Sequence, residues 1–193
     1  MDPTCSPEDA INALDRSKLL SIARGSISHG LAHHKPLAVD ATQHSAALQE
    51  PKGCFVTLHL HDALRGCVGS LRARGPLVAE VARSAYSAAF RDTRFQPVSA
   101  SEAEQLDVHV SVLSEPLPLQ FSDEADLLAQ LRPGVDGLIL SDGARLGTFL
   151  PQVWDKFPDP KDFMVQLRLK AGLPHDHWSD SLTVERYTTE SFS

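Results

Sequence analysis

The chain has 193 residues, of which 42% are hydrophobic and 22% charged, and its formal net charge is −7. This length and composition predict an ordered domain with a sizeable core, and the negative charge argues against a general nucleic-acid binder, which needs a positive surface to meet phosphates. The first ten residues, MDPTCSPEDA, resemble no secretory leader, and no stretch approaches the roughly 20 apolar residues that span a bilayer, so a cytoplasmic protein is expected.

The first segment in chain order, residues 6–52, is predicted to be a helical N-terminal arm. Ser6 can cap the free amides of a helix whose first position suits Pro7, and Gly30 or the histidine-rich loop after it is expected to end that helix. Residues 33–52 are mixed in character and indicate an irregular connection over the surface.

The first half of the domain, residues 53–115, changes to period-two patterning. Residues 54–60 and 64–71 are predicted strands of a hairpin, joined by a loop at residues 61–63. Gly75-Pro76 then begins a helix with apolar residues at helical spacing, and a half-buried strand follows at residues 106–112.

The second half, residues 116–193, repeats this order. Asp142-Gly143 predicts a type I′ hairpin turn, a helix runs from Pro160 to Lys170 with Gly172 as its terminator, and residues 182–187 form a last strand. We therefore expect an α+β fold: a single two-lobed domain over residues 1–193, with an internal hairpin–helix–strand duplication and a mixed, mainly antiparallel sheet flanked by helices.

The register of the first hairpin decides which way its cysteine faces. If the apolar residues of both strands lie on one buried face, Leu60 must oppose Leu64, which requires a three-residue loop. The same pairing places Thr57 opposite Cys67 and His59 opposite Arg65, all on the second face. Cys54 has the parity of the core residues and is expected to fill core space.

The surroundings of Cys67 leave two interpretations open. Arg65 lies two residues away and would favour the nucleophilic thiolate, while Gly66 and Gly69 suggest close approach of a ligand. Alternatively, the glycines only relieve packing beneath a helix and Cys67 fills the gap. The three cysteines, at positions 5, 54 and 67, are odd in number and include no C-x-x-C pair, so reduced thiols are expected.

A basic segment surrounds this hairpin. Residues 65–94 contain six arginines and two acids, a local surplus of four positive charges in an acidic chain. The surplus predicts either a site for a small anionic ligand or a solvated basic face.

Six phrases of this sequence resemble those of the AMMECR domain family, whose bacterial members are called protein A of the AmmeMemoRadiSam system. They are LRGCVGSL, AAFRDTRFQPVS, VSVLSEPLPL, PGVDGLILSDG, FLPQV and KAGLPHDHW, in order between about Leu19 and Phe192. The family hallmark reads L-R-G-C-I-G, with Val68 here in place of isoleucine. Two positions depart from the family pattern: Gln96 replaces a usual proline, and His109 stands where relatives more often carry a carboxylate.

The resemblance implies a two-lobed α/β domain with an internal duplication and the hallmark lining a cleft. The resemblance also implies an enzyme, since the family is regarded as enzymatic, although the reaction of the family is unsettled. It also implies association with a Memo-type protein and a radical S-adenosylmethionine protein, whereas eukaryotic relatives suggest regulatory roles.

The sequence supports two classes of function. In a cysteine-dependent enzyme acting on a small anionic metabolite, Cys67 would be the nucleophile and His59 a base on the same face. The substrate would be held by Arg65, Gly66, Gly69 and Arg94, with Asp92 orienting a base or Arg94. Asp92 and Arg94 equally suit a structural ion pair, and His59 an exposed strand histidine. The second class is a non-catalytic module that binds a ligand or protein partner through the same cleft.

No metal or nucleotide cofactor is indicated. The histidine pairs His59-x-His61, His33-His34 and His175-x-His177 lack the second pair that a zinc pattern requires, and the chain has no P-loop or G-x-G-x-x-G motif. Four aromatic residues, Phe149, Trp154, Phe163 and Trp178, are expected in the core.

Overall fold

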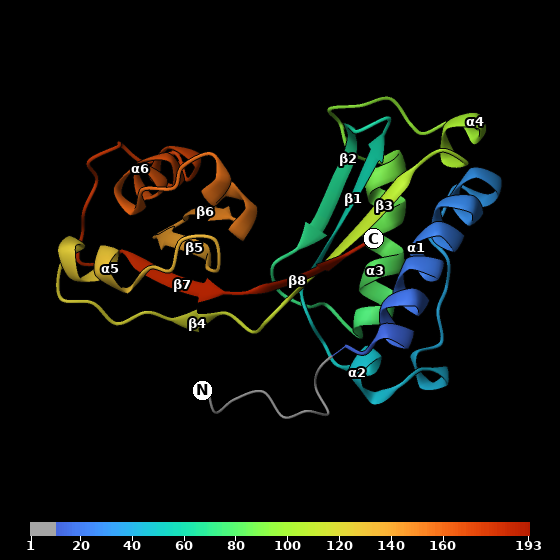
Figure 1. The fold of residues 1–193 in the computed structure, drawn as a ribbon, viewed down its shortest axis with the longest axis horizontal. Coiled ribbons are helices and arrows are strands. Elements are labelled where there is room, and N and C mark those ends of the chain that lie inside the picture. The colour runs from blue at the N-terminus through green and yellow to red at the C-terminus, as the bar shows by residue number, and fades with distance from the viewer. Residues whose placement is uncertain (1–10) are drawn as a thin grey trace. The chain divides into compact units, whose positions relative to one another are not determined.

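The computed structural model describes residues 11–193, which form two compact units (Figure 1). Unit 1 extends to Val112 and includes Glu190–Ser193, and unit 2 is Leu113–Thr189. The expected α+β class is confirmed, because helices pack against antiparallel sheets. The expected single sheet is wrong: the described residues contain two four-stranded sheets, one in each unit.

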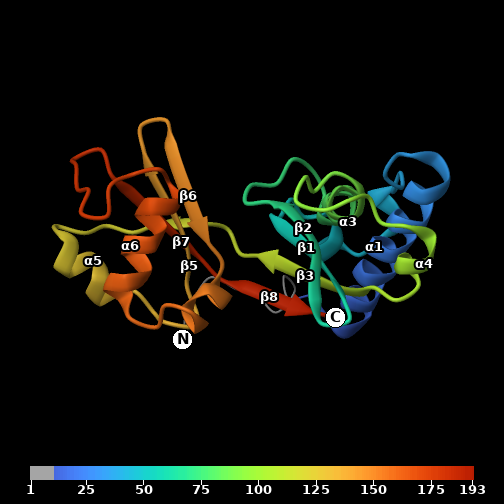
Figure 2. The same ribbon diagram turned by 90° about the horizontal axis from the view of Figure 1, so that it is seen from above.

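Unit 1 holds a sheet backed by helices (Figure 2). Its elements are α1 (Ala13–His33), a 3₁₀ turn (Ala41–Gln43), α2 (Ala46–Gln49), β1 (Cys54–Leu60), β2 (Ala63–Ser70), α3 (Leu77–Phe90), α4 (Ala100–Ala103), β3 (Asp107–Leu113) and β8 (Thr189–Phe192). The side chains of Cys54, Val56 and Leu58 point from β1 into a core shared with α1 and α3. The helix predicted after Gly75-Pro76 is confirmed as α3.

Unit 2 repeats the design with its own core. Its elements are β4 (Leu117–Pro118), α5 (Glu124–Gln130), β5 (Gly137–Asp142), β6 (Arg145–Phe149), a 3₁₀ helix (Pro151–Asp155), α6 (Pro160–Lys170) and β7 (Thr183–Tyr187). The helix predicted from Pro160 to Lys170 is confirmed, and Gly172 follows it at φ 76°. No helix within residues 11–193 is both long and apolar enough to cross a membrane.

The strand orders confirm the predicted duplication. The first sheet has the order β2-β1-β3-β8, and the second, counted from its hairpin, has the matching order β6-β5-β7-β4. Each fourth strand follows the third strand of the other sheet, because the chain continues from β3 into β4 and from β7 into β8. The pattern analysis had not identified β8, which is only four residues long.

The N-terminal helix ends in the histidine-rich stretch that was one of its two predicted ends. Its predicted start at Ser6 and Pro7 lies outside the described residues. The described helix α1 begins at Ala13, where the Asn12 side chain accepts a hydrogen bond from the Asp15 amide. It continues past Gly30 and ends at His33, before His34 at φ 57°.

Both hairpin turns differ from the predicted geometry. In the first hairpin, His61 and Asp62 have φ values of 51° and 64°, so these two residues make the tight turn and Ala63 already pairs with Leu60. In the second, Asp142 pairs with Arg145, and Gly143 at φ 58° is the first of two turn residues. Positive φ at both central positions, which defines the predicted I′ turn, therefore occurs in the first hairpin and not in the second.

A β-bulge compensates for the shorter first turn. Leu58 pairs with Gly66 but His59 pairs with Leu64, so Arg65 is an extra residue in β2. The predicted pairs Leu60–Leu64 and His59–Arg65 are therefore wrong, and Leu64 is exposed. Beyond the bulge the predicted register is confirmed, including Thr57 opposite Cys67.

The close approach of β2 to α3 generates a first prediction. A Cβ at Gly66 would lie 2.2 Å from the Ala88 carbonyl oxygen, which belongs to a helix backbone and cannot move aside easily. We expect Gly66→Ala to lower the free energy of unfolding by about 3 kcal/mol in urea titrations. Gly75→Ala is the matched control, because its Cβ would meet only the Arg83 side chain, at 3.5 Å. Equal stability of the two variants would contradict this account of the β2–α3 packing.

Candidate functional site

The side chain of Cys67 points away from the helices of unit 1. Its neighbour Gly66 is buried against α3, and its partner Thr57 lies between Val56 and Leu58, both fully buried on the core side. Because side chains alternate along a strand, Thr57 and Cys67 occupy the opposite face, where both are partly exposed. There the Thr57 hydroxyl donates a hydrogen bond to the Cys67 sulfur at 3.3 Å. The predicted orientation of Cys67 is confirmed.

The backbone of Cys67 is held from the edge of the sheet. Since β2 is an edge strand, its outward amides and carbonyls have no neighbouring strand. Asp92, just after α3, fills this position: its Oδ2 accepts a hydrogen bond from the Cys67 amide at 2.9 Å. Arg94 Nη2 donates to the Cys67 carbonyl oxygen at 3.4 Å. Together the two side chains replace a missing strand at the position of the cysteine.

Asp92 and Arg94 also form an ion pair with each other. Arg94 donates through Nε to Asp92 Oδ1 at 2.9 Å and through Nη2 to Oδ2 at 2.6 Å. The guanidinium holds the pKa of Asp92 well below its usual value, against the opposing effect of burial, and the Cys67 amide lowers it further. The Asp92 side chain is 6% exposed, whereas that of Arg94 is 55% exposed. Arg94 is therefore both a structural partner and a cation that solvent can reach.

Arg65 forms an ion pair with Glu102, which lies outside the basic segment of residues 65–94. Its Nε and Nη2 donate to Glu102 at 2.9 and 3.2 Å, which lowers the pKa of Glu102 to about 2. The Phe95 ring lies near both guanidinium groups, with its centroid 6.0 Å from Arg65 Cζ and 5.4 Å from Arg94 Cζ. We call Arg65, Asp92, Arg94, Phe95 and Glu102 the edge cluster.

The glycines of the hallmark have packing reasons. Gly66 allows the contact with the Ala88 carbonyl, and a Cβ at Gly69 would lie 2.2 Å from the Cys54 carbonyl oxygen and 2.6 Å from the Phe55 ring. These contacts favour the packing interpretation for both glycines. Their role in holding a substrate stays a prediction.

Two histidines share the open face with Cys67. His109 of β3 pairs with Thr57, and the His59 and His109 rings meet edge to face at 5.0 Å. Burial lowers the pKa of His109, and the charge of His59 lowers it further. Cys67 and His109 stand two strands apart, about 10 Å at the backbone, and within residues 11–193 neither imidazole hydrogen-bonds the sulfur.

Three contacts of this site were missed by the sequence analysis: the Thr57 bond to sulfur, and the roles of Phe95 and Glu102. The pattern Ser99-x-x-Glu102 does carry a signal, because it is a capping box that the structure contains at the start of α4. That signal predicts a helix start and gives no indication that Glu102 meets Arg65. In the described part of the chain, no group of three or more His, Cys, Asp or Glu side chains is placed to hold a metal ion.

Cys54 provides an internal contrast. It is 1% exposed within the core, 3.9 Å from the Ser84 hydroxyl, and burial raises the pKa of its thiol to about 12. The prediction that Cys54 fills core space is confirmed. Cys5 lies outside the described residues.

The Asp92 contacts generate a second prediction. Asp92→Asn removes the charge that binds Arg94 and the Cys67 amide, so we expect the free energy of unfolding at neutral pH to fall by about 2 kcal/mol and hydrogen exchange of the Cys67 amide to accelerate. Since the pKa of Asp92 is lowered on folding, its contribution is present above the ordinary value of 3.8 and is lost as the pH falls below it. The stabilities of variant and wild type should converge in acid.

Asp107→Asn is the control for this experiment, because Asp107 is an exposed acid on β3 of the same sheet. We expect it to change the stability by less than about 0.5 kcal/mol. Loss of stability that is equal in the two variants, or unchanged exchange at Cys67 in Asp92→Asn, would show that Asp92 does not hold the strand.

Comparison with known proteins agrees with this architecture. The family model AMMECR1 matches residues 20–192. A protein of Methanothermobacter thermautotrophicus is 39% identical over 176 residues, which cover 90% of this chain and 91% of that protein. Protein MJ0810 of Methanocaldococcus jannaschii is 34% identical over 174 residues, covering 88% and 85%.

A solved structure shows the same fold. The crystal structure of the uncharacterized protein PH0010 from Pyrococcus horikoshii matches with a TM-score of 0.80 and 34% identity, over 90% of this chain and 88% of that one. With a family model that spans nearly the whole sequence and relatives this similar, the chain belongs to the AMMECR1 family.

Proposed function

We propose that this protein is a cysteine-dependent enzyme that acts on a small anionic metabolite, with Cys67 as its nucleophile. The observation that carries the proposal is the hydrogen bond from the Thr57 hydroxyl to the Cys67 sulfur, on the sheet face turned away from α3. A hydroxyl donor stabilises negative charge on sulfur, and the thiolate is the nucleophilic form.

Arg94 supports the anionic character of the substrate. Its guanidinium is 55% exposed, and the charge of Cys67 contributes, after the Asp92 bond, to raising the pKa of Arg94. A cation coupled to the sulfur in this way can attract a carboxylate or phosphate group toward the thiolate. Arg65 is a weaker candidate for the same role, since Glu102 already engages two of its nitrogens.

His59 and His109 would exchange protons with the bound substrate and not with the Cys67 thiol. Both lie on the face of Cys67, and His109 has a lowered pKa, which favours the neutral imidazole that can accept a proton. This assignment extends the predicted base from His59 to the pair.

The alternative is a non-catalytic module that binds a ligand or protein partner through the same face. Two observations favour it: Arg65 and Arg94 are both paired with carboxylates, and the hallmark glycines have packing roles. In that case the thiol would be incidental. The family resemblance implies partnership with Memo-type and radical S-adenosylmethionine proteins. We include this partnership in the proposal, because it is compatible with an enzyme and with a binding module.

Thiol reactivity is the third prediction. In a Cys5→Ser background, Cys67 should be alkylated by iodoacetamide near neutral pH, while Cys54 should react only on unfolding because it is buried. Thr57→Val keeps the side-chain shape and removes the donor, so we expect Cys67 alkylation to slow roughly fivefold, the equivalent of about 1 kcal/mol. Mass spectrometry of the labelled peptides measures both rates. A Cys67 as inert as Cys54, or a rate unaffected by Thr57→Val, would contradict the proposal.

A fourth prediction separates the enzyme from the binding module. The gene should be deleted and replaced by wild type, Cys67→Ser or Cys5→Ser, and small anionic metabolites compared among the strains. If Cys67 is the nucleophile, Cys67→Ser should reproduce the deletion profile although the protein stays folded, while Cys5→Ser should match wild type. A Cys67→Ser strain with the wild-type profile would favour the binding module.

A further inference from the structure

A second candidate site lies wholly in unit 2 and shares no residue with the site around Cys67. Where the segment after β4 separates from β7, it leaves a hollow of about 330 Å³. The lining residues are Pro118, Leu119, Gln120, Phe121, Ser122, Trp178, Ser179, Asp180, Leu182, Thr183 and Val184. This volume is at the lower end of the roughly 300–1,000 Å³ typical of small-molecule sites.

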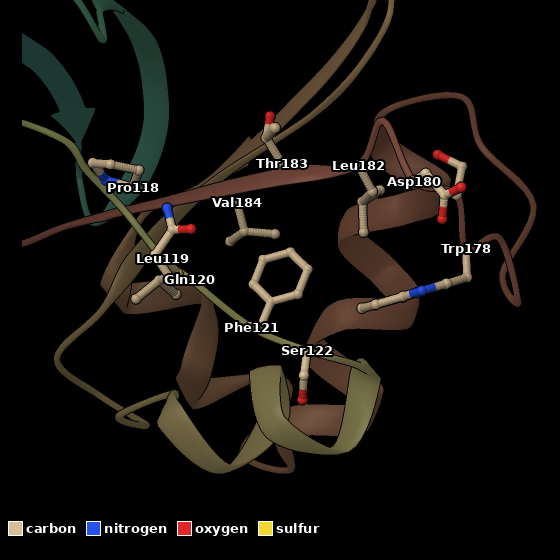
Figure 3. A pocket seen from close by; sticks show the side chains of 11 residues that line it. Pro118, Leu119, Gln120, Phe121, Ser122, Trp178, Asp180, Leu182, Thr183 and Val184 are labelled. Atoms are coloured by element: carbon tan, nitrogen blue, oxygen red, sulfur yellow. The ribbon is translucent and has the colours of Figure 1, made fainter.

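The apolar wall of this pocket is aromatic. Figure 3 shows the ring of Phe121 next to the indole of Trp178, with Leu182 and Val184 nearby. The two ring centroids are 5.6 Å apart and the rings are inclined at 60°, so they form a corner and do not stack. Trp178 is 39% exposed, which contradicts the expectation that it belongs to the core. Ring faces that remain open to solvent are suited to contact with a cation.

The pocket lining carries one charge, and it is negative. Asp180 is the one charged residue among those that line it. Two further carboxylates lie directly behind lining residues: Asp126 accepts hydrogen bonds from Ser122, and Asp142 accepts one from Ser179 at 3.1 Å. The bond from the Ser122 amide lowers the pKa of Asp126. Bonds from Ser181 and His177, and to a smaller extent that from Ser179, lower the pKa of Asp142.

We propose that this pocket binds a small organic cation with an alkylated or primary ammonium group. The aromatic corner would face the ammonium group, Asp180 would balance its charge, and Leu182 and Val184 would contact its carbon chain. An anionic ligand would face Asp180 with no lining cation to receive it. The inference does not depend on Cys67, since all lining residues belong to unit 2.

Tryptophan fluorescence provides a direct test. The chain has two tryptophans, and Trp154 is 2% exposed, stacked on Phe163 at 3.8 Å, and donates its indole N–H to the Asp136 carbonyl. A saturable change on adding choline should therefore report on Trp178. The matched ligand is 3,3-dimethylbutan-1-ol (dimethylbutanol below), which is choline with a carbon atom in place of the ammonium nitrogen. We expect it to bind about tenfold more weakly, because it lacks the charge.

Two variants assign the contacts. Asp180→Asn should weaken choline binding about fivefold and leave binding of dimethylbutanol unchanged, while Phe121→Leu should weaken choline binding because it keeps an apolar wall without a ring face. Asp176→Asn, an exposed acid of the same loop that does not line the pocket, should bind choline as the wild type does.

The proposal is overturned if choline produces no saturable change in the intact protein, or if choline and dimethylbutanol bind equally. It is also overturned if Asp180→Asn binds choline as well as Asp176→Asn does. Butyrate, an anion of similar size, should produce no saturable change, and tighter binding of butyrate than of choline would reverse the charge assignment.

Discussion

The hydrogen bond between the Cys67 amide and Asp92 is the contact on which the candidate site depends. An edge strand presents backbone groups that need partners, and at β2 one partner is a buried carboxylate 25 residues further along the chain. The bond fixes the strand from outside the sheet while Thr57 fixes the sulfur from within it. Cys67 is thereby held at both its backbone and its side chain without being buried.

In the edge cluster, two arginines of the basic segment, Arg65 and Arg94, have their charges balanced by carboxylates. Arg94 is bound by Asp92 within the segment, and Arg65 is bound by Glu102 beyond its end. The Phe95 ring lies near both guanidinium groups, and so near both ion pairs. Of these two arginines, Arg94 retains an exposed surface from which it can act on a ligand.

The internal duplication shows which features serve the fold and which are specific to unit 1. Leu58 pairs with Gly66 in one hairpin as Leu140 pairs with Gly147 in the other, and both glycines admit the C-terminal end of the following helix. The position after the glycine is Cys67 in unit 1 and Thr148 in unit 2, where the hydroxyl is bound to the Leu138 carbonyl and to Tyr187. The glycine is therefore common to the architecture, and the thiol occurs in one copy.

The sequence by itself determined the α+β class, the repeated hairpin–helix–strand order, and the assignment of Cys67 to the face opposite Cys54. These follow from local periodicity, which backbone geometry translates directly into helices, strands and faces. The tertiary structure alone decided the two-residue turn at His61–Asp62, the bulge at Arg65, the Glu102 partner of Arg65 and the exposure of Trp178. Each of these features depends on energies summed over several contacts, and no local sequence pattern encodes such a sum. The turn must match the twist of its strands, and Glu102 meets Arg65 from a position 37 residues further along the chain.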